Sequence, residues 1–190
     1  MLKKKRWSLV SGVALLVVAF VPFGFAQDEK QKEEKIFANI AGGGTRALEV
    51  VISQSSTKSQ RARLLGALDS EGQEAMMKIL QDLPRVGSVR VQGGAYASTA
   101  LRYAYETKTK DGKRHIIALT PRPVSLSEAR SQDTSLDYDL TVIELFLPEK
   151  GKGDGAMVAG AKVRIDDETG RIKIEAFQAN PTKLVNVYTK

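Results

Sequence analysis

The chain has no cysteine and only one histidine, His115. The missing cysteine excludes disulfides, thiol catalysis and attachment of a lipid to an N-terminal cysteine. A single histidine cannot supply the usual zinc ligand sets, and any Ser-His-Asp system would have to use His115. The motif G-x-S-x-G is also absent. We therefore expect a domain held by its hydrophobic core, with no metal and no cofactor.

Acidic residues are missing from the first 26 positions, which begin with a basic cluster. An apolar run over residues 9–20 follows, then Pro22 and the small residues Gly24 and Ala26. This order predicts a secretory signal peptide that is cut between Ala26 and Gln27. The alternative is an uncleaved anchor, because residues 8–26 carry no charge and are long enough to span a bilayer. Both readings place the body outside the cytoplasm, in the periplasm or the external medium.

The net charge of +7 belongs mainly to this N-terminal segment. Its four basic residues leave 25 basic and 22 acidic side chains in the rest of the chain, a net charge of +3. Phosphate-backbone binding usually needs a stronger positive field, so no nucleic-acid partner is expected. Contact with a membrane is expected only through residues 8–26, if they are not removed.

Three segments are predicted along the chain. Residues 1–26 are the signal peptide, and residues 27–45 form a polar and glycine-rich spacer that includes "DEKQKEEK" and three consecutive glycines. Residues 46–190 form a single β-rich domain, long enough to bury a core of its own.

One helix is strongly predicted within this domain. Ser70 and Gln73 have the spacing of a capping box, and an apolar stripe at helical spacing runs from Ala75 to Leu83. Pro84 ends the pattern. A shorter helical stretch is indicated over residues 59–68.

The remaining pattern is that of β-strands joined by short turns, which requires antiparallel pairing. The predicted class is therefore α+β, mainly β: an antiparallel meander sheet or a partly closed barrel, with one principal helix packed on it. The predicted strands cover residues 46–53, 86–92, 99–110, 113–120, 138–147, 156–165, 171–177 and 183–188.

The stretch "KTKDGKRHI", residues 108–116, predicts a hairpin that turns at Asp111 and Gly112. A two-residue turn there places His115 opposite Lys108, on the polar face near the tip. This tip is a candidate for binding an anion, and the alternative is a solvated hairpin end that discourages edge pairing. The candidate anion-binding side chains are Lys108, Lys110, Lys113 and His115.

Acidic residues in and before strand 138–147 are the candidates for catalysis. Asp137 and Asp139 alternate onto one face, whereas Glu144 lies on the other face among apolar side chains. Glu144 with one of these aspartates, or His115, could serve a carboxylate-dependent hydrolase. The alternative is a structural ion pair or an exposed side chain.

A third acidic stretch, "DDETG" at residues 166–170, lacks the ligand spacing of an EF-type calcium loop. It therefore indicates an acidic turn closed by Gly170.

Three stretches carry a resemblance: "LLGALDSEGQEAMMKILQDLPRVGSVR", "IIALTPRPVSLSEARSQDTSLDYDLTVIELFL" and "GKGDGAMVAGAKVRIDDETGRIKIEAF". Over most of residues 46–188 the chain resembles a family of uncharacterised exported bacterial proteins. The resemblance implies a single exported domain. Because that family has no assigned activity, it supplies no catalytic residues.

The function predicted from the sequence is that of an exported, non-catalytic binding or envelope-associated domain. Two alternatives remain open: a small carboxylate-dependent hydrolase, and a module that binds anions or polyanions through the basic hairpin tip. The absence of a credible catalytic set favours the first.

Overall fold

The computed structural model describes residues 33–42, 44, 46–92, 98–122, 124, 139–177 and 180–190. The predicted signal peptide, its cut between Ala26 and Gln27, and the candidate Asp137 lie outside these residues.

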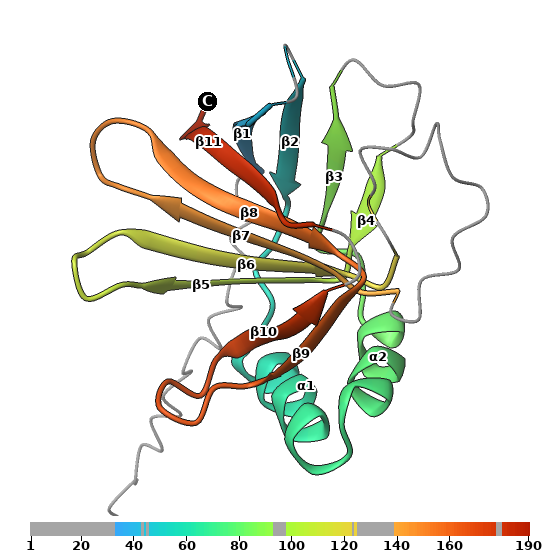
Figure 1. Ribbon diagram of the computed structural model, residues 1–190. Coiled ribbons are helices and arrows are strands. Elements are labelled where there is room, and N and C mark those ends of the chain that lie inside the picture. Colours follow the sequence, from blue (N-terminus) through green and yellow to red (C-terminus); the bar gives the residue numbers. More distant parts are fainter. Residues whose placement is uncertain are drawn as a thin grey trace, which may run out of the picture. The chain divides into compact units, whose positions relative to one another are not determined.

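The fold is mainly β, as predicted: nine antiparallel strands form a nearly closed, barrel-like sheet on which two helices pack (Figure 1). The strands follow one another in the order β4-β3-β2-β1-β11-β8-β7-β6-β5. Each predicted strand range overlaps at least one strand of the structure, and the ranges 99–110 and 156–165, each predicted as a single strand, include residues of two. The nine are β1 (Glu34–Ile40), β2 (Ala47–Ile52), β3 (Gly87–Val91), β4 (Thr99–Leu101), β5 (Tyr103–Lys108), β6 (Arg114–Thr120), β7 (Thr141–Leu147), β8 (Gly153–Ala159) and β11 (Thr182–Thr189).

Closure of the sheet comes from one bend in the chain. Strands β4 and β5 stand at opposite ends of the strand order, yet only Arg102 separates them in sequence. The Arg102 backbone N–H donates to the carbonyl of Leu119 on β6 at 3.0 Å, and its guanidinium donates to the carbonyl of Leu83 at 2.8 Å. One bent segment thus supplies both edges of the sheet, which favours the partly closed barrel over the open meander.

Strand β1 corrects the predicted boundary of the spacer. Residues 34–40 were assigned to the polar segment, but they pair with both β2 and β11 in the middle of the strand order. Ile36, Ala38 and Ile40 are buried, and their alternation along the strand sends them to one face. The domain therefore begins before residue 46 and includes residues 34–40, which the charged and glycine-rich composition of their surroundings had placed in the spacer.

Strands β6 and β7 are buried on both faces. Ile116, Ile143 and Leu145 point into a core shared with β1, β2 and β11. Leu119 and Val142 point the other way, into a second core that contains the helices. Burial on both faces explains why "HIIALT" and "TVIELFL" are almost continuously apolar rather than alternating.

The second core is covered by two helices, α1 (Lys58–Ser70) and α2 (Gln73–Asp82), rather than by one principal helix. The capping box was predicted at Ser70 and Gln73, but it forms at the start of α1. The Thr57 side chain accepts from the backbone of Gln60, and the Gln60 side chain accepts from the backbone of Thr57. Ser70 instead ends α1, and its hydroxyl donates to the carbonyl of Gly66 at 2.8 Å. In the described part of the chain, neither helix has the length and hydrophobicity of a membrane span.

Gln73 holds the helices to a separate two-stranded hairpin, β9 (Ala161–Ile165) and β10 (Ile172–Phe177). Its side-chain amide donates to the carbonyl of Ala161 at 2.9 Å and accepts from the N–H of Val163 at 2.8 Å. Val163 and Ala161 are buried in the second core. The hairpin is therefore fixed beside α2 by both polar and apolar contacts.

The predicted register of the β5–β6 hairpin is wrong by one residue. Thr107, not Lys108, lies opposite His115, and Lys108 lies opposite Arg114. The turn is longer than predicted: Thr109 N–H donates to Lys113 at 2.9 Å, Gly112 N–H donates to Thr109 at 3.0 Å, and Gly112 has φ 82°. This is a three-residue loop with glycine in the left-handed position. The slip moves His115 from the polar tip to the face that carries the second core.

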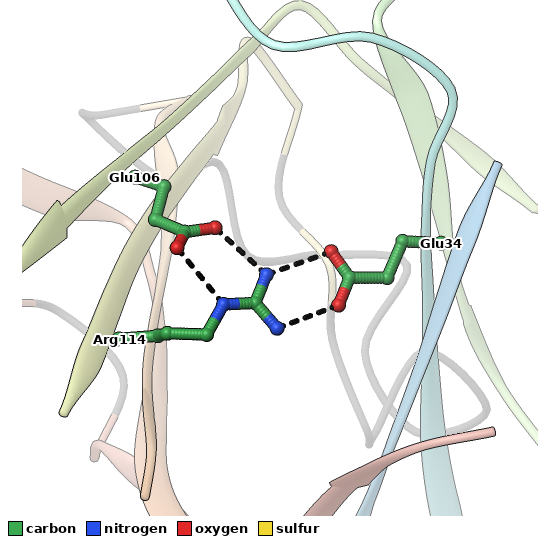
Figure 2. Close-up of polar contacts among 3 residues, drawn as sticks. All are labelled: Glu34, Glu106 and Arg114. Atoms are coloured by element: carbon green, nitrogen blue, oxygen red, sulfur yellow. Dashed lines mark hydrogen bonds and ion pairs between the residues drawn. The ribbon is translucent and has the colours of Figure 1, made fainter. Parts of the chain in front are cut away.

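Arg114 then lies on the opposite face, where it links strands that are not neighbours in the sheet. Figure 2 shows its guanidinium between Glu106 on β5 and Glu34 on β1, with two hydrogen bonds of 2.7–2.9 Å to each carboxylate. Strands β11, β8 and β7 stand between β1 and β6 in the strand order. The hydrogen bond from Arg114 lowers the pKa of Glu106. The hydrogen bonds to Glu106 and Glu34 in turn raise the pKa of Arg114. We call these three residues the Arg114 clamp.

Candidate functional site

A cleft with a volume of about 380 Å³ separates β6 and β7 from the β9–β10 hairpin. Its size falls in the range of small-molecule sites. The cleft is lined by polar groups from β6, β7, the β9–β10 turn and β10, and by the apolar side chains of Ile117, Val142, Phe146, Ile172 and Ile174. Apart from Val142, these apolar side chains are only partly buried, so apolar surface is left exposed to whatever enters the cleft.

His115 forms the floor of the polar part. It is only 5% exposed, and its ring stacks on Phe146 with centroids 4.5 Å apart and an interplanar angle of 5°. Its Nε2 lies 2.7 Å from Oε1 of Glu144 on β7. Glu144 does lie on the same face as Val142 and Phe146, as the alternation predicted, and its partner is the histidine.

Arg171, immediately before β10, approaches the other side of the imidazole, with a guanidinium nitrogen 3.5 Å from Nδ1 of His115. A guanidinium only donates, so we assign Nδ1 as the acceptor in this 3.5 Å contact and place the ring hydrogen on Nε2, which donates it to Glu144. Among the residues that the structure describes, no carboxylate pairs with Arg171, and its other N–H groups have no acceptor. The guanidinium therefore keeps donors for a ligand.

The remaining charges in the cleft neutralise each other. Lys173 lies 3.4 Å from the carboxylate of Asp166. The hydroxyl and backbone N–H of Thr169 also donate to Asp166, at 2.8 and 2.9 Å, and these bonds lower its pKa. Gly170 N–H closes the loop on the carbonyl of Asp166, with φ 60° at the glycine. Residues 166–170 thus form the predicted acidic turn. Within the described ranges, no three histidine or acidic side chains are grouped so that they could hold a metal ion.

The catalytic candidates are only partly assembled. Glu144 and His115 are in contact, but Asp139 is exposed, precedes β7 and does not line the cleft. Both nitrogens of His115 are already engaged, so neither is free to take a proton from a nucleophile. The second carboxylate in the cleft, Asp166, is held by Lys173 and Thr169. This arrangement can bind and orient charged groups, and the second oxygen of Glu144 is the one carboxylate acceptor in the cleft that no described residue engages.

The anion-binding candidates at the hairpin tip are divided. Lys108 and Lys110 are exposed, whereas Lys113 pairs with Asp111 at 2.9 Å. Hydrogen bonds from Thr109 and then Lys113 lower the pKa of Asp111 to about 2. His115 lies on the opposite face from Lys108 and is buried. The tip therefore keeps two unpaired lysines among the described residues and lacks the histidine.

Sequence reasoning did not propose Arg171 and Lys173 as site residues. Their stretch, "RIKI", alternates basic and apolar residues and correctly indicated a strand. Nothing local to that strand says that it lies against Glu144 and His115. The contact depends on how Gln73 and the second core hold the hairpin.

Comparison of the chain with protein-family models, with curated proteins and with solved structures finds no match. Any functional assignment therefore depends on the geometry of the cleft, and the resemblance to exported proteins stays a prediction.

Proposed function

We propose that this protein is an exported, non-catalytic binding domain that takes a small molecule into the cleft between β6–β7 and the β9–β10 hairpin. The observation that carries the proposal is the combination of partly exposed apolar walls with a guanidinium, Arg171, whose donors are mostly unused. Small-molecule sites commonly combine apolar walls with a few convergent polar groups.

Binding is favoured over hydrolysis by the state of the two candidate catalytic groups. A general base needs a free acceptor within reach of the substrate proton, but His115 has Glu144 on one nitrogen and Arg171 on the other. A mechanism with two carboxylates needs a second acid across the cleft, and Asp166 is paired with Lys173.

Export is supported by the basic start, apolar run and small-residue exit of the first 26 residues. An uncleaved N-terminus would leave the same domain tethered to the outside of a membrane. In either case the cleft would meet extracytoplasmic solutes.

The test is a thermal-shift screen of the mature domain against a panel of amino acids, sugars, nucleotides and short carboxylic acids. We expect at least one compound to raise the melting temperature of the wild type and to be recovered chemically unchanged. The same compound is expected not to raise the melting temperature of Ile174→Trp, because the indole would fill the cleft. The matched control is Phe177→Trp, because Phe177 is exposed on the same strand and does not line the cleft. Stabilisation that survives Ile174→Trp, or turnover that Glu144→Gln abolishes, would overturn the proposal.

A further inference from the structure

We infer that the ligand of this cleft is an α-amino acid with an apolar side chain. The inference rests on the proposed function and specifies the chemistry of its ligand.

Charged groups of opposite sign stand on the two sides of the His115 ring in the cleft. The His115 ring contacts Arg171 through Nδ1, at 3.5 Å, and Glu144 through Nε2, at 2.7 Å. The guanidinium and the carboxylate are thus held apart by one imidazole ring and a hydrogen bond at each end. An α-amino acid could bridge this gap, with its carboxylate hydrogen-bonded to Arg171 and its ammonium hydrogen-bonded to Glu144. The distance that it would span in this way is similar to the distance between the guanidinium and the Glu144 carboxylate. Arg171 keeps free donors for the ligand carboxylate, and Oε2 of Glu144 has no partner among the described residues for the ammonium.

The charges of the arginine, lysine and carboxylate side chains that line the cleft are balanced. The cleft is lined by two basic side chains, Arg171 and Lys173, and two acidic ones, Glu144 and Asp166. Lys173 and Asp166 pair with each other, and the His115 ring lies between the two remaining charges, with one ring nitrogen facing Arg171 and the other facing Glu144. A zwitterion keeps this balance, whereas a phosphate or a diamine would add uncompensated charge beside Glu144 or Arg171.

The apolar walls of the cleft limit the size of the ligand side chain. The ligand side chain would lie on Ile117, Ile172 and Ile174. A separate pocket of about 20 Å³ shares Ile117, Arg171 and Ile172 with the cleft and is also lined by Leu65 and Tyr105; it has room for little more than one water molecule. A long acyl chain would not fit there without displacing these side chains, whereas a branched side chain of leucine size would remain in the wider part.

The test is calorimetric titration of the mature domain with leucine and with two analogues that each lose one charge. N-acetyl-leucine lacks the ammonium, and leucinamide lacks the carboxylate. We expect leucine to bind at least tenfold more tightly than either, because each charge-assisted hydrogen bond is worth about tenfold or more. Arg171→Gln is expected to weaken leucine at least tenfold and leave leucinamide unchanged. Glu144→Gln is expected to weaken leucine and leave N-acetyl-leucine unchanged.

The control variant is Arg90→Gln, because Arg90 pairs with Glu49 and neither residue lines the cleft. It is expected to bind leucine like the wild type. Leucinamide or N-acetyl-leucine binding as tightly as leucine would overturn the inference. The inference would also be overturned if no apolar amino acid bound while another compound of the panel occupied the cleft. In that case the proposed function would stand. If no compound of the panel occupied the cleft, both would fail.

Discussion

Substituting Arg114 by methionine tests whether the Arg114 clamp stabilises the sheet by joining β6 to the distant strand β1. The variant keeps most of the aliphatic length of the side chain and removes both halves of the Arg114 clamp. Exposed ion pairs are worth about 0.2–1 kcal/mol, whereas breaking buried ones costs about 3–5 kcal/mol. The side chains of Arg114, Glu34 and Glu106 are 32, 30 and 38% exposed. We therefore expect the free energy of unfolding to fall by about 1–2 kcal/mol.

The assay is urea unfolding, with Arg90→Met as the matched control. Arg90 also pairs with a glutamate, but it joins adjacent strands and its side chain is 53% exposed. Its removal is expected to cost less than about 0.5 kcal/mol. The midpoint is expected to fall for Arg114→Met without a change in slope. Equal effects of the two variants would contradict a clamp that joins distant strands.

The effect of Arg114→Met also depends on pH. Arg114 lowers the pKa of Glu106 in the folded state, chiefly by a direct hydrogen bond. A carboxylate whose pKa is lowered by folding stabilises the protein above its unfolded pKa of about 4.3, and this contribution is lost as the pH falls through the folded-state value. The difference between wild type and variant is therefore expected to be larger at pH 7 than at pH 3. An equal difference at the two pH values would refute the electrostatic origin.

Three further predictions concern the backbone, a helix cap and export. Gly155→Ala is expected to cost about 1–3 kcal/mol in urea unfolding, because a Cβ there would collide with a backbone oxygen of β7, whereas Gly66→Ala, in open space on α1, is expected to stabilise by about 0.5–1 kcal/mol. Thr57→Ala is expected to cost about 1 kcal/mol and Ser70→Ala close to none, and the reverse order would refute the observed cap. Mass spectrometry of the exported protein is expected to find Gln27 at its N-terminus, and an intact mass would indicate the anchor instead.

The sequence predicts most of the strands and the fold class because alternation and turn residues are local signals. The sequence does not correctly predict features that depend on several interactions at once, such as the register of the β5–β6 hairpin and the position of the capping box. Both faces of strand β6 carry apolar side chains, so the apolar pattern is compatible with either register of the β5–β6 hairpin. The Asp-Gly pair then favoured a two-residue turn, which predicted the wrong register. Thr57 and Gln60 have the same spacing as Ser70 and Gln73. Local sequence alone could not say that Gln73 would bind β9 instead.

The candidate site was partly predictable for the same reason. Glu144 stood out as a carboxylate in an apolar strand, which required exposure or a partner. The identity of that partner depended on the one-residue slip that turns His115 toward β7. Arg171 depends further on the docking of a separate hairpin. An alternation of "RIKI" does not encode its distance from a histidine 56 positions earlier.

The most direct test of the binding cleft is an NMR titration of the mature domain with the tightest compound of the panel, following the His115 imidazole and the Arg171 side chain. We expect both signals to shift together and to saturate with one equivalent of ligand, while the amide signals of Lys108 and Lys110 do not shift. Shifts confined to the hairpin tip, with His115 and Arg171 unmoved, would contradict this expectation.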